Sequence, residues 1–320
     1  MAAFRLFVAV DVSAEVRRAL DEALRPLREL APGARWTAPE KWHLTLQFLG
    51  GVDAQRLGEL AQGLGQAALA SHPFALQLSG AGTFGRPGHD TVLWAGAAEG
   101  ALPLERLARG VGAVLAPLGF PPEARPFAPH LTLARAQDGR RGDPHLAAVA
   151  AALRGWKGPT CTVDRLVLYE STPAGAYLSR LAARLPSWRF VPHTAEVKVE
   201  LEADSEAGLF SAATGAFAEL LSGAPGVAGR SVDREVEVHG ADPVARWVAF
   251  WDELVFLSET VPGIPRRCRV TSLGPEGMRA VVEVAVDAPL ETPVKAATLH
   301  DANFTPGADG PWRAAVVLDV

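Results

Sequence analysis

The stretch His43-Leu44-Thr45-Leu46 occurs a second time as His130-Leu131-Thr132-Leu133. From ordinary residue usage, a given histidine is followed by Leu-Thr-Leu by chance only about once in a thousand times. Two copies among eight histidines therefore form a pattern from which the first half of the chain can be interpreted. Each copy lies in an apolar, alternating segment, which is typical of a β-strand.

The alternation fixes which side chains share a face of each predicted strand. Successive side chains of a strand point to opposite faces, so His43 and Thr45 lie on one face and the leucines on the other. The same parity places His130 beside Thr132 in the second strand. If the leucines pack on a core and the two strands meet at a groove, the groove receives two imidazoles and two hydroxyls.

Two imidazoles in one groove suit a reaction that needs a general acid and a general base together. Opening a cyclic phosphodiester is such a reaction: one histidine takes a proton from water, and the other gives one to the departing ribose oxygen. Hydroxyls of Thr45 and Thr132 and a guanidinium can stabilise the phosphoryl oxygens without a metal. Arg135 can supply that guanidinium only if its strand ends or bulges near Ala134, because strict alternation places Arg135 on the leucine face. A lone histidine in a strand would be interpreted as structural, but a matched pair favours catalysis.

These motifs resemble those of the 2H phosphoesterases, in the RNA 2′,3′-cyclic phosphodiesterase branch once called 2′-5′ RNA ligases. The resemblance covers about residues 4–185 and includes HLTLQFLG, HLTLAR and LYESTPAGAY, which begin at His43, His130 and Leu168. It implies an α+β, bilobal fold with two antiparallel sheets around a groove and a pseudo-twofold duplication. It also implies that His43 and His130 are catalytic and that Thr45, Thr132 and Arg135 bind the phosphate. The residues leave open which histidine is the acid, and analogy favours His43 as acid and His130 as base.

Charge and length divide the chain into two predicted domains, 1–187 and 188–320, joined at Pro186-Ser187. Residues 1–187 carry 20 Lys and Arg against 16 Asp and Glu, whereas residues 188–320 carry 11 against 20, which indicates different partners. In the first domain we expect a helix over 14–30 and a Gly-rich turn over 80–88.

The end of the chain suggests a metal site. An acidic side chain beside a terminal carboxylate offers oxygen ligands for a hard divalent cation, although a solvated aspartate is the simpler interpretation. Residues 188–320 resemble archease, the activator of the GTP-dependent tRNA-splicing RNA ligase, in FVPHTAE from Phe190, WVAFWDELVFL from Trp247 and the final LDV. The resemblance implies an α+β domain with a divalent cation held by Glu196 and Asp319. The terminal carboxylate of Val320 is a further candidate ligand for Ca²⁺ or Mg²⁺. Glu196 stands where the family has Asp, and Lys295 could take the cation's place.

Together these patterns predict an RNA-end-processing enzyme. Its first domain would hydrolyse RNA 2′,3′-cyclic phosphate to 2′-phosphate without a cofactor, and its second would assist an RNA ligase. Two alternatives stay open: a phosphodiesterase for small cyclic nucleotides or ADP-ribose cyclic phosphates, and a largely non-catalytic ligase activator. The two cysteines lie far apart, at 161 and 268, and we find no signal peptide and no apolar run of the ~20 residues that span a membrane. These features predict a cytoplasmic protein.

Overall fold

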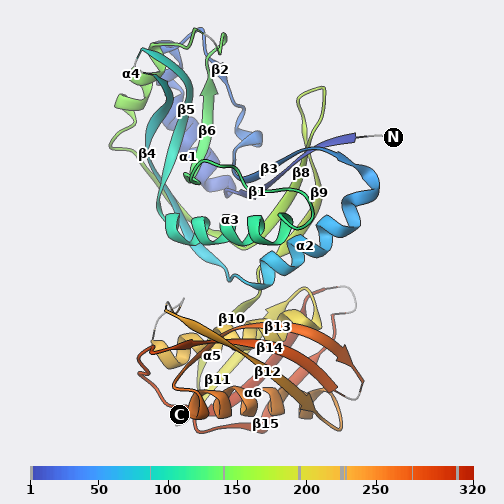
Figure 1. The fold of residues 1–320 in the computed structure, drawn as a ribbon. Coiled ribbons are helices and arrows are strands. Elements are labelled where there is room, and N and C mark those ends of the chain that lie inside the picture. Colours follow the sequence, from blue (N-terminus) through green and yellow to red (C-terminus); the bar gives the residue numbers. More distant parts are fainter. Residues whose placement is uncertain are drawn as a thin grey trace. The chain divides into compact units, whose positions relative to one another are not determined.

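The computed structural model describes residues 3–86, 88–139, 141–193, 196–223, 227, 229–275, 277–307 and 310–320, with His193 described by its backbone alone. Its internal contacts divide the chain into two units (Figure 1). The first comprises Met1–Ala68 and Pro73–Ala183, and the second comprises Leu69–His72 and Arg184–Val320. In the part of the chain that is described, no helix is long and apolar enough to cross a membrane.

In its described residues, the first unit is built on a nine-stranded antiparallel sheet. Its strands follow the order β7 (Lys157–Val163), β4 (Phe74–Arg86), β5 (His89–Glu99), β6 (His130–Arg135), β3 (His43–Asp53), β1 (Ala3–Asp11), β8 (Arg165–Ser171) and β9 (Tyr177–Arg184), while the short β2 (Arg35–Trp36) pairs with β6. The two motif strands β6 and β3 lie at the centre and pair through Leu44 and Leu131. The expectation of two separate sheets is therefore wrong: this backbone pairing joins the two groups of four strands into one sheet.

Among the described residues, four helices accompany this sheet: α1 (Ala14–Leu24), α2 (Leu57–Leu69), α3 (Ala101–Leu115) and α4 (His145–Ala152). α1 contacts β7, and α4 contacts β4 and β5. α1 begins where Ser13 accepts a hydrogen bond from the Val16 N–H at 3.2 Å. The predicted helix over 14–30 ends early, because Pro26 has no N–H to continue it and starts a 3₁₀ turn, Pro26–Leu30.

The predicted Gly-rich turn is instead part of the long β4–β5 hairpin. Gly82 lies under the indole of Trp94, and a Cβ at Gly82 would come within 2.3 Å of that ring. This glycine therefore serves close packing within a strand and not the reversal of the chain.

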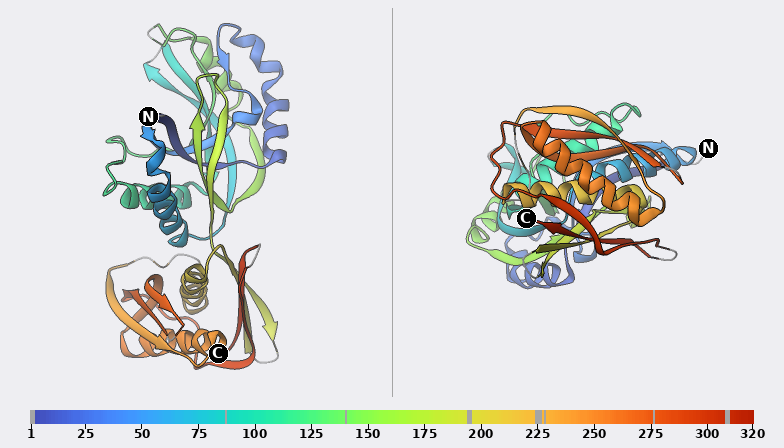
Figure 2. Two further views of the ribbon diagram at one scale, coloured as in Figure 1. Left: turned by 90° about the vertical axis from the view of Figure 1, so that its right-hand side faces the viewer. Right: turned by 90° about the horizontal axis from the view of Figure 1, so that it is seen from below.

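The described part of the second unit is an α+β structure with two sheets and two helices. One sheet has the order β10 (Ser187–His193), β11 (Glu196–Ala203), β16 (Trp312–Asp319), β15 (Ala296–Thr305), and the other the order β12 (Ser231–His239), β14 (Gly277–Val286), β13 (Gly263–Gly274). Helices α5 (Glu206–Ser222) and α6 (Pro243–Thr260) contact both sheets and lie between them (Figure 2). Such helices bury most of their surface, and Phe210, Trp247 and Trp251 are accordingly fully buried.

Candidate functional site

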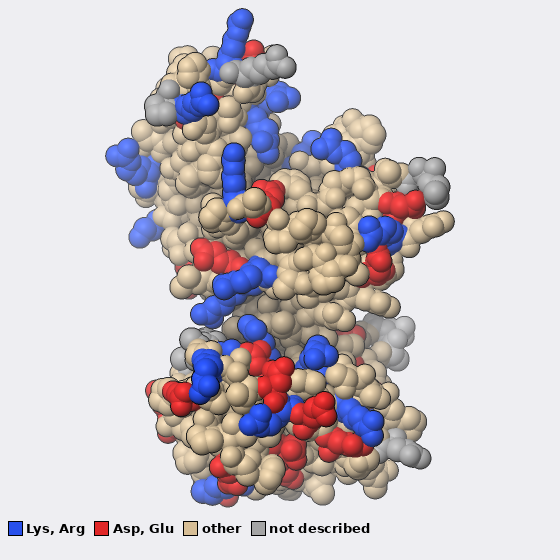
Figure 3. Space-filling model, viewed as in Figure 1, with Lys and Arg blue, Asp and Glu red and all other residues tan. Residues whose placement is uncertain are grey.

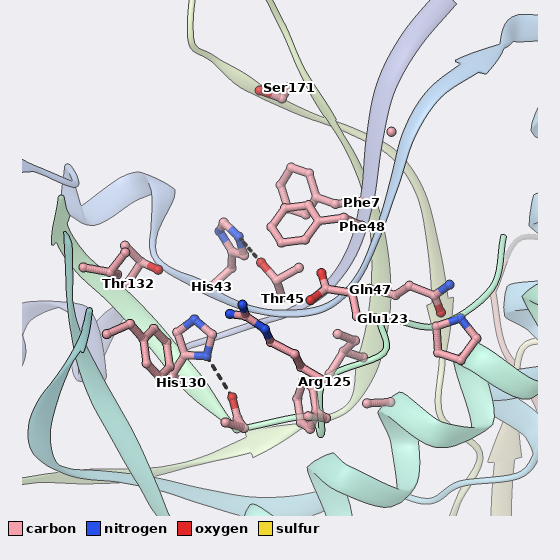
Figure 4. Close-up of a pocket in the computed structure, with 18 of the residues that line it drawn as sticks. Phe7, His43, Thr45, Gln47, Phe48, Glu123, Arg125, His130, Thr132 and Ser171 are labelled. Carbon is pink, nitrogen blue, oxygen red and sulfur yellow. Dashed lines mark hydrogen bonds between the residues drawn. The ribbon is translucent and has the colours of Figure 1, made fainter. Parts of the chain in front are cut away.

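A groove of about 1300 Å³ in the first unit is lined by both motif strands (Figure 4). His43 and Thr45 enter it from β3, and His130, Thr132 and Arg135 enter it from β6. The leucines between them are buried on the opposite face of the sheet. The pairing of the two strands thus brings together all five residues for which the sequence predicted catalysis or phosphate binding.

Each imidazole is oriented by the carbonyl two residues before it. The Nδ1 of His43 lies 2.7 Å from the Lys41 oxygen, and the Nδ1 of His130 lies 2.8 Å from the Ala128 oxygen. A carbonyl oxygen can only accept, so both Nδ1 atoms carry the proton and the Nε2 atoms are left for proton transfer. The Nε2 of His43 lies 3.0 Å from the Thr45 hydroxyl (Figure 4).

Burial lowers the pKa of His43 below its usual value of 6.5. The charges of Arg17 and His130 act in the same direction, and the Lys41 carbonyl and the Asp11 carboxylate oppose them. His43 is therefore neutral at pH 7, with a lone pair on Nε2, which is the form of a general base. This direction of shift argues against the analogy that made His43 the acid.

A bulge in β6 turns Arg135 toward the groove. Trp94 of β5 pairs with Thr132 but Leu93 pairs with Ala134, so Leu133 is an extra residue in the ladder. After the bulge, Arg135 faces the same side as the histidine and threonine. The sequence predicted that Arg135 could reach the groove only if its strand ended or bulged near Ala134, and the bulge at Leu133 fulfils this requirement.

The first motif has the same bulge at the same offset. Ala9 pairs with Thr45 and Val8 pairs with Gln47, so Leu46 is the extra residue. The side chain brought to the groove is Phe48, which stands five residues after its histidine, as Arg135 does after His130. Sequence reasoning missed Phe48, although superposing the two motifs would have paired it with Arg135.

Arg125 is a second residue that the sequence did not single out. It belongs to the exposed segment that leads into His130, and its guanidinium points into the groove in the close-up (Figure 4). The buried Gln47 holds the start of this segment, since its Nε2 donates to the Phe120 and Pro121 oxygens at 2.8 and 3.3 Å. Among the described residues, five basic and two acidic side chains line the groove: Arg5, Lys41, Arg109, Arg125, Arg135, Glu105 and Glu123. This excess favours an anionic ligand.

The residues predicted to bind a metal lie at one end of the four-stranded sheet of the second unit. Val197 pairs with Leu318, which places Glu196 and Asp319 at neighbouring strand ends. The ammonium of Lys295 lies 3.4 Å from the Asp319 carboxylate and donates to a terminal oxygen of Val320 at 2.9 Å. No group of three or more His, Cys, Asp or Glu side chains among the described residues is arranged to hold a metal. As placed, the Lys295 ammonium is a counter-ion of the Asp319 carboxylate.

The surface charge of the second unit is mixed. On the face shown in Figure 3, its carboxylates lie among Lys and Arg side chains. Glu237 pairs with Arg279 at 3.0 Å, and Glu202 pairs with Arg313 at 3.3 Å. The excess of acidic residues in this half of the sequence does not by itself identify a partner.

Comparison with known protein families shows to which family the chain belongs. Residues 10–94 and 96–186 match the family described as LigT like Phosphoesterase, which is more than half of the chain. The chain belongs to this family. Residues 188–320 match the Archease protein family, so the LigT-like phosphoesterase segment is followed by an archease domain.

Individual relatives of this LigT-like phosphoesterase cover parts of it. An RNA 2′,3′-cyclic phosphodiesterase from Geobacillus stearothermophilus is 36% identical over 133 residues, which are 42% of this chain and 42% of the relative. The chain thus spans less than half the length of that relative. One from Archaeoglobus fulgidus is 35% identical over 145 residues, 45% of this chain and 78% of the relative. The crystal structure of an archease from Thermotoga maritima, described as a possible chaperone, is 19% identical, covers 41% of this chain and 94% of its own, and has a TM-score of 0.32.

Proposed function

We propose that this protein hydrolyses 2′,3′-cyclic phosphate ends of RNA to 2′-phosphates, using two histidines and no metal. The observation that carries the proposal is that one groove receives His43 and His130 together with Arg135. Relatives that share the first domain are named RNA 2′,3′-cyclic phosphodiesterase, which supports the choice of substrate.

The proposed reaction assigns one proton transfer to each histidine. Neutral His43 takes a proton from a water molecule through Nε2, and the water oxygen forms a bond to phosphorus. The bond from phosphorus to the ribose O3′ breaks, and His130, as the general acid, gives a proton from Nε2 to that oxygen. Arg135 and the hydroxyls of Thr45 and Thr132 bind the non-bridging oxygens, whose negative charge rises in the transition state.

Hydrolysis of an oligoribonucleotide ending in a 2′,3′-cyclic phosphate tests the proposal. His43→Ala and His130→Ala should each lower kcat by about 10²–10⁴-fold, and EDTA should have no effect. His239→Ala changes an exposed histidine of the second unit and should leave kcat unchanged. Activity like that of the wild type in either motif mutant would refute the mechanism, and faster turnover of a free cyclic nucleotide than of RNA would favour a small-molecule substrate.

We also propose that residues 188–320 assist a GTP-dependent tRNA-splicing RNA ligase in the cytoplasm. The match of this whole segment to the archease family supports this role. The test measures guanylylation of the ligase in three reactions: with the full chain added, with residues 1–187 added, and with the ligase by itself. Equal guanylylation in all three reactions would refute it, whereas stimulation by a full chain carrying His43→Ala would show that activation does not need the phosphodiesterase site.

A further inference from the structure

The groove extends well beyond the two motif histidines. Its volume of about 1300 Å³ exceeds the roughly 300–1,000 Å³ that is usual for a pocket that binds one small ligand. In Figure 4, Ser171 lies above Phe7, on the side away from His43 and His130. Ser171 is the last residue of β8 and also lines the groove. The part of the groove near Ser171 is therefore available for a longer ligand.

Arg5 lies at this same end of the groove. Arg5 and Phe7 are two residues apart on β1, so their side chains point to the same face of the sheet. On β8, Glu170 pairs with Leu6, so Ser171 follows at the level of Arg5. Both Arg5 and Ser171 line the groove. A guanidinium and a hydroxyl thus reach the groove from neighbouring strands.

No side chain stands beside Arg5 on its other neighbour, β3. Arg5 pairs there with Gly51, and a Cβ at Gly51 would have no heavy atom within 4 Å apart from its chain neighbours. Glycine at such a position lets a ligand approach the strand closely. Arg180 of β9 pairs with Glu170, whereas the exposed Arg5 forms no ion pair with any carboxylate in the described part of the chain. The charge of Arg5 is therefore open to an anion from solvent.

The position of Arg5 fits a phosphate other than the one that reacts. Asp11 pairs with His43, and Arg5 precedes Asp11 by six residues on β1. At ~3.3 Å per residue, about 20 Å of strand separate Arg5 from the level of His43. A mononucleotide held at the histidines is shorter than this distance, whereas an RNA chain has a further phosphodiester at each nucleotide.

The opposite end of the groove has a different charge. There α3 contributes Glu105 and Arg109, and Glu123 follows Pro122, against which Gly112 of α3 packs. Two carboxylates beside one guanidinium disfavour a phosphate, because like charges repel. Glu105 and Glu123 are the acidic residues among the described residues that line the groove, so the end formed by β1 and β8 is the better site for an anion.

We propose that Arg5, Ser171 and the open strand at Gly51 form a subsite for an upstream phosphodiester of the RNA, so that the enzyme prefers a chain to a mononucleotide. This inference rests on the proposed phosphodiesterase function and adds the path of the RNA beyond its reacting end. The guanidinium of Arg5 and the hydroxyl of Ser171 donate hydrogen bonds to the non-bridging oxygens. Contacts to phosphate carry no information about the bases, so the subsite accepts any sequence.

The test compares an oligoadenylate that ends in a 2′,3′-cyclic phosphate with adenosine 2′,3′-cyclic phosphate. The ratio of the two kcat/KM values measures the preference for a chain. Arg5→Gln should lower this ratio by about 5-fold, which is the upper end for an exposed ion pair, and Arg5→Lys should retain most of it. Replacing the upstream phosphodiesters one at a time by a neutral methylphosphonate should identify one position at which kcat/KM falls by this factor in the wild type and not in Arg5→Gln.

Gly51 provides a test of the charge that leaves Arg5 in place. Gly51→Glu adds a carboxylate opposite Arg5 across the two strands, where an ion pair can form. The ratio should then fall as it does in Arg5→Gln. Gly51→Gln adds an uncharged side chain of the same size and should lower the ratio less. An equal fall in both Gly51 variants would show that space and not charge matters here, and would refute the phosphate contact.

Two further variants locate the subsite. Arg154→Gln removes an exposed arginine of the first unit that does not line the groove and should leave the ratio unchanged. An equal fall in Arg154→Gln and Arg5→Gln would reflect net charge alone and would overturn the inference. A fall in Arg109→Gln without one in Arg5→Gln would assign the RNA chain to the opposite end of the groove and would overturn it as well.

Failure of the proposed function has a different signature, because the wild type would then hydrolyse neither substrate. Equilibrium binding of an oligoadenylate with a 2′-phosphate end tests the subsite without turnover. For single strands, the logarithm of the binding constant falls with the logarithm of the salt concentration by about 0.7 per phosphate contact. Arg5→Gln should reduce the magnitude of this slope by about 0.7, and an unchanged slope would refute the contact.

Discussion

Tyr169 donates its hydroxyl to both carboxylate oxygens of Asp11, at 3.0 and 2.9 Å. Asp11 pairs with His43 in the β1–β3 ladder. Burial and the Asp11 charge raise the pKa of Tyr169 to about 12, so its hydroxyl remains a donor at neutral pH. The carboxylate thus held in place partly offsets the effect of burial on the pKa of His43.

Replacing Asp11 should move the acid limb of the pH–rate profile. If His43 is the base, kcat/KM is lost as the pH falls through the pKa of His43 in the free enzyme, which lies below 6.5. Asp11→Asn removes the charge that raises this pKa, so the limb should move to lower pH. Asp164→Asn changes an exposed carboxylate that pairs with Arg165 and should not move it. A limb that moves to higher pH in Asp11→Asn would contradict the electrostatic account.

The local pattern of the sequence predicted the histidine faces, because alternation within one strand needs no knowledge of its neighbours. It could not predict the bulge at Leu133, because a bulge is defined by how β6 pairs with the neighbouring strand β5, and the sequence of one strand does not contain that pairing. Arg125 was missed for a related reason: its segment is held by a hydrogen bond from Gln47 to Phe120, 73 residues away. The Gly-rich stretch was predicted to be a turn, but Gly82 is required because the Trp94 ring, twelve residues away in the sequence, packs against its backbone.

A substrate with a better leaving group should reveal which histidine is the acid. In a cyclic phosphorothiolate with sulfur at the 3′ position, the leaving thiolate needs no proton. If His130 is the acid, His130→Ala should regain most of its lost activity on this substrate, and His43→Ala should not. The measurement is kcat for both mutants on the oxygen and sulfur substrates. Rescue of His43→Ala alone would reverse the assignment and restore His43 as acid.

Gln47 and Arg125 should act as one unit. Hydrogen bonds to a charged group contribute about 1.5–3 kcal/mol, so Arg125→Ala should lower kcat/KM by roughly 10- to 150-fold. Gln47→Leu releases the segment that carries Arg125 and should lower kcat/KM by less. The double mutant should then resemble Arg125→Ala, because coupled residues are not additive. Gln77→Leu is the matched control, since Gln77 also donates to a backbone oxygen, that of Gly158, at 3.0 Å. Strictly additive losses would show that Gln47 does not act through Arg125.

Residues 1–187 should fold and retain phosphodiesterase activity without the archease domain. Every residue that lines the groove belongs to the first unit. Leu69–His72 belongs to the second unit, where the Ser211 hydroxyl donates to the Leu69 oxygen, so the truncated protein should have a lower Tm. Kinetics and thermal unfolding of residues 1–187 and of the full chain check both expectations. An insoluble or inactive fragment would show that the two parts depend on one another.

Lys295 should compete with any divalent cation at the end of β16. Its ammonium contacts Asp319 and the terminal oxygen of Val320, so a cation must displace it before it can reach these ligands. We therefore expect weak binding of Ca²⁺ to the wild type and tighter binding to Lys295→Met, in which the Asp319 carboxylate loses its contact with the lysine. Ca²⁺ should bind better than Mg²⁺, because its coordination geometry is more flexible.

Calorimetric titration of the full chain measures these affinities. Adding Asp319→Asn to Lys295→Met should abolish the gain, since it removes a carboxylate ligand. Adding Asp233→Asn, on β12 in the other sheet, should leave it intact. Equal affinity in the wild type and in Lys295→Met would contradict the expectation that Lys295 competes with a cation for Asp319.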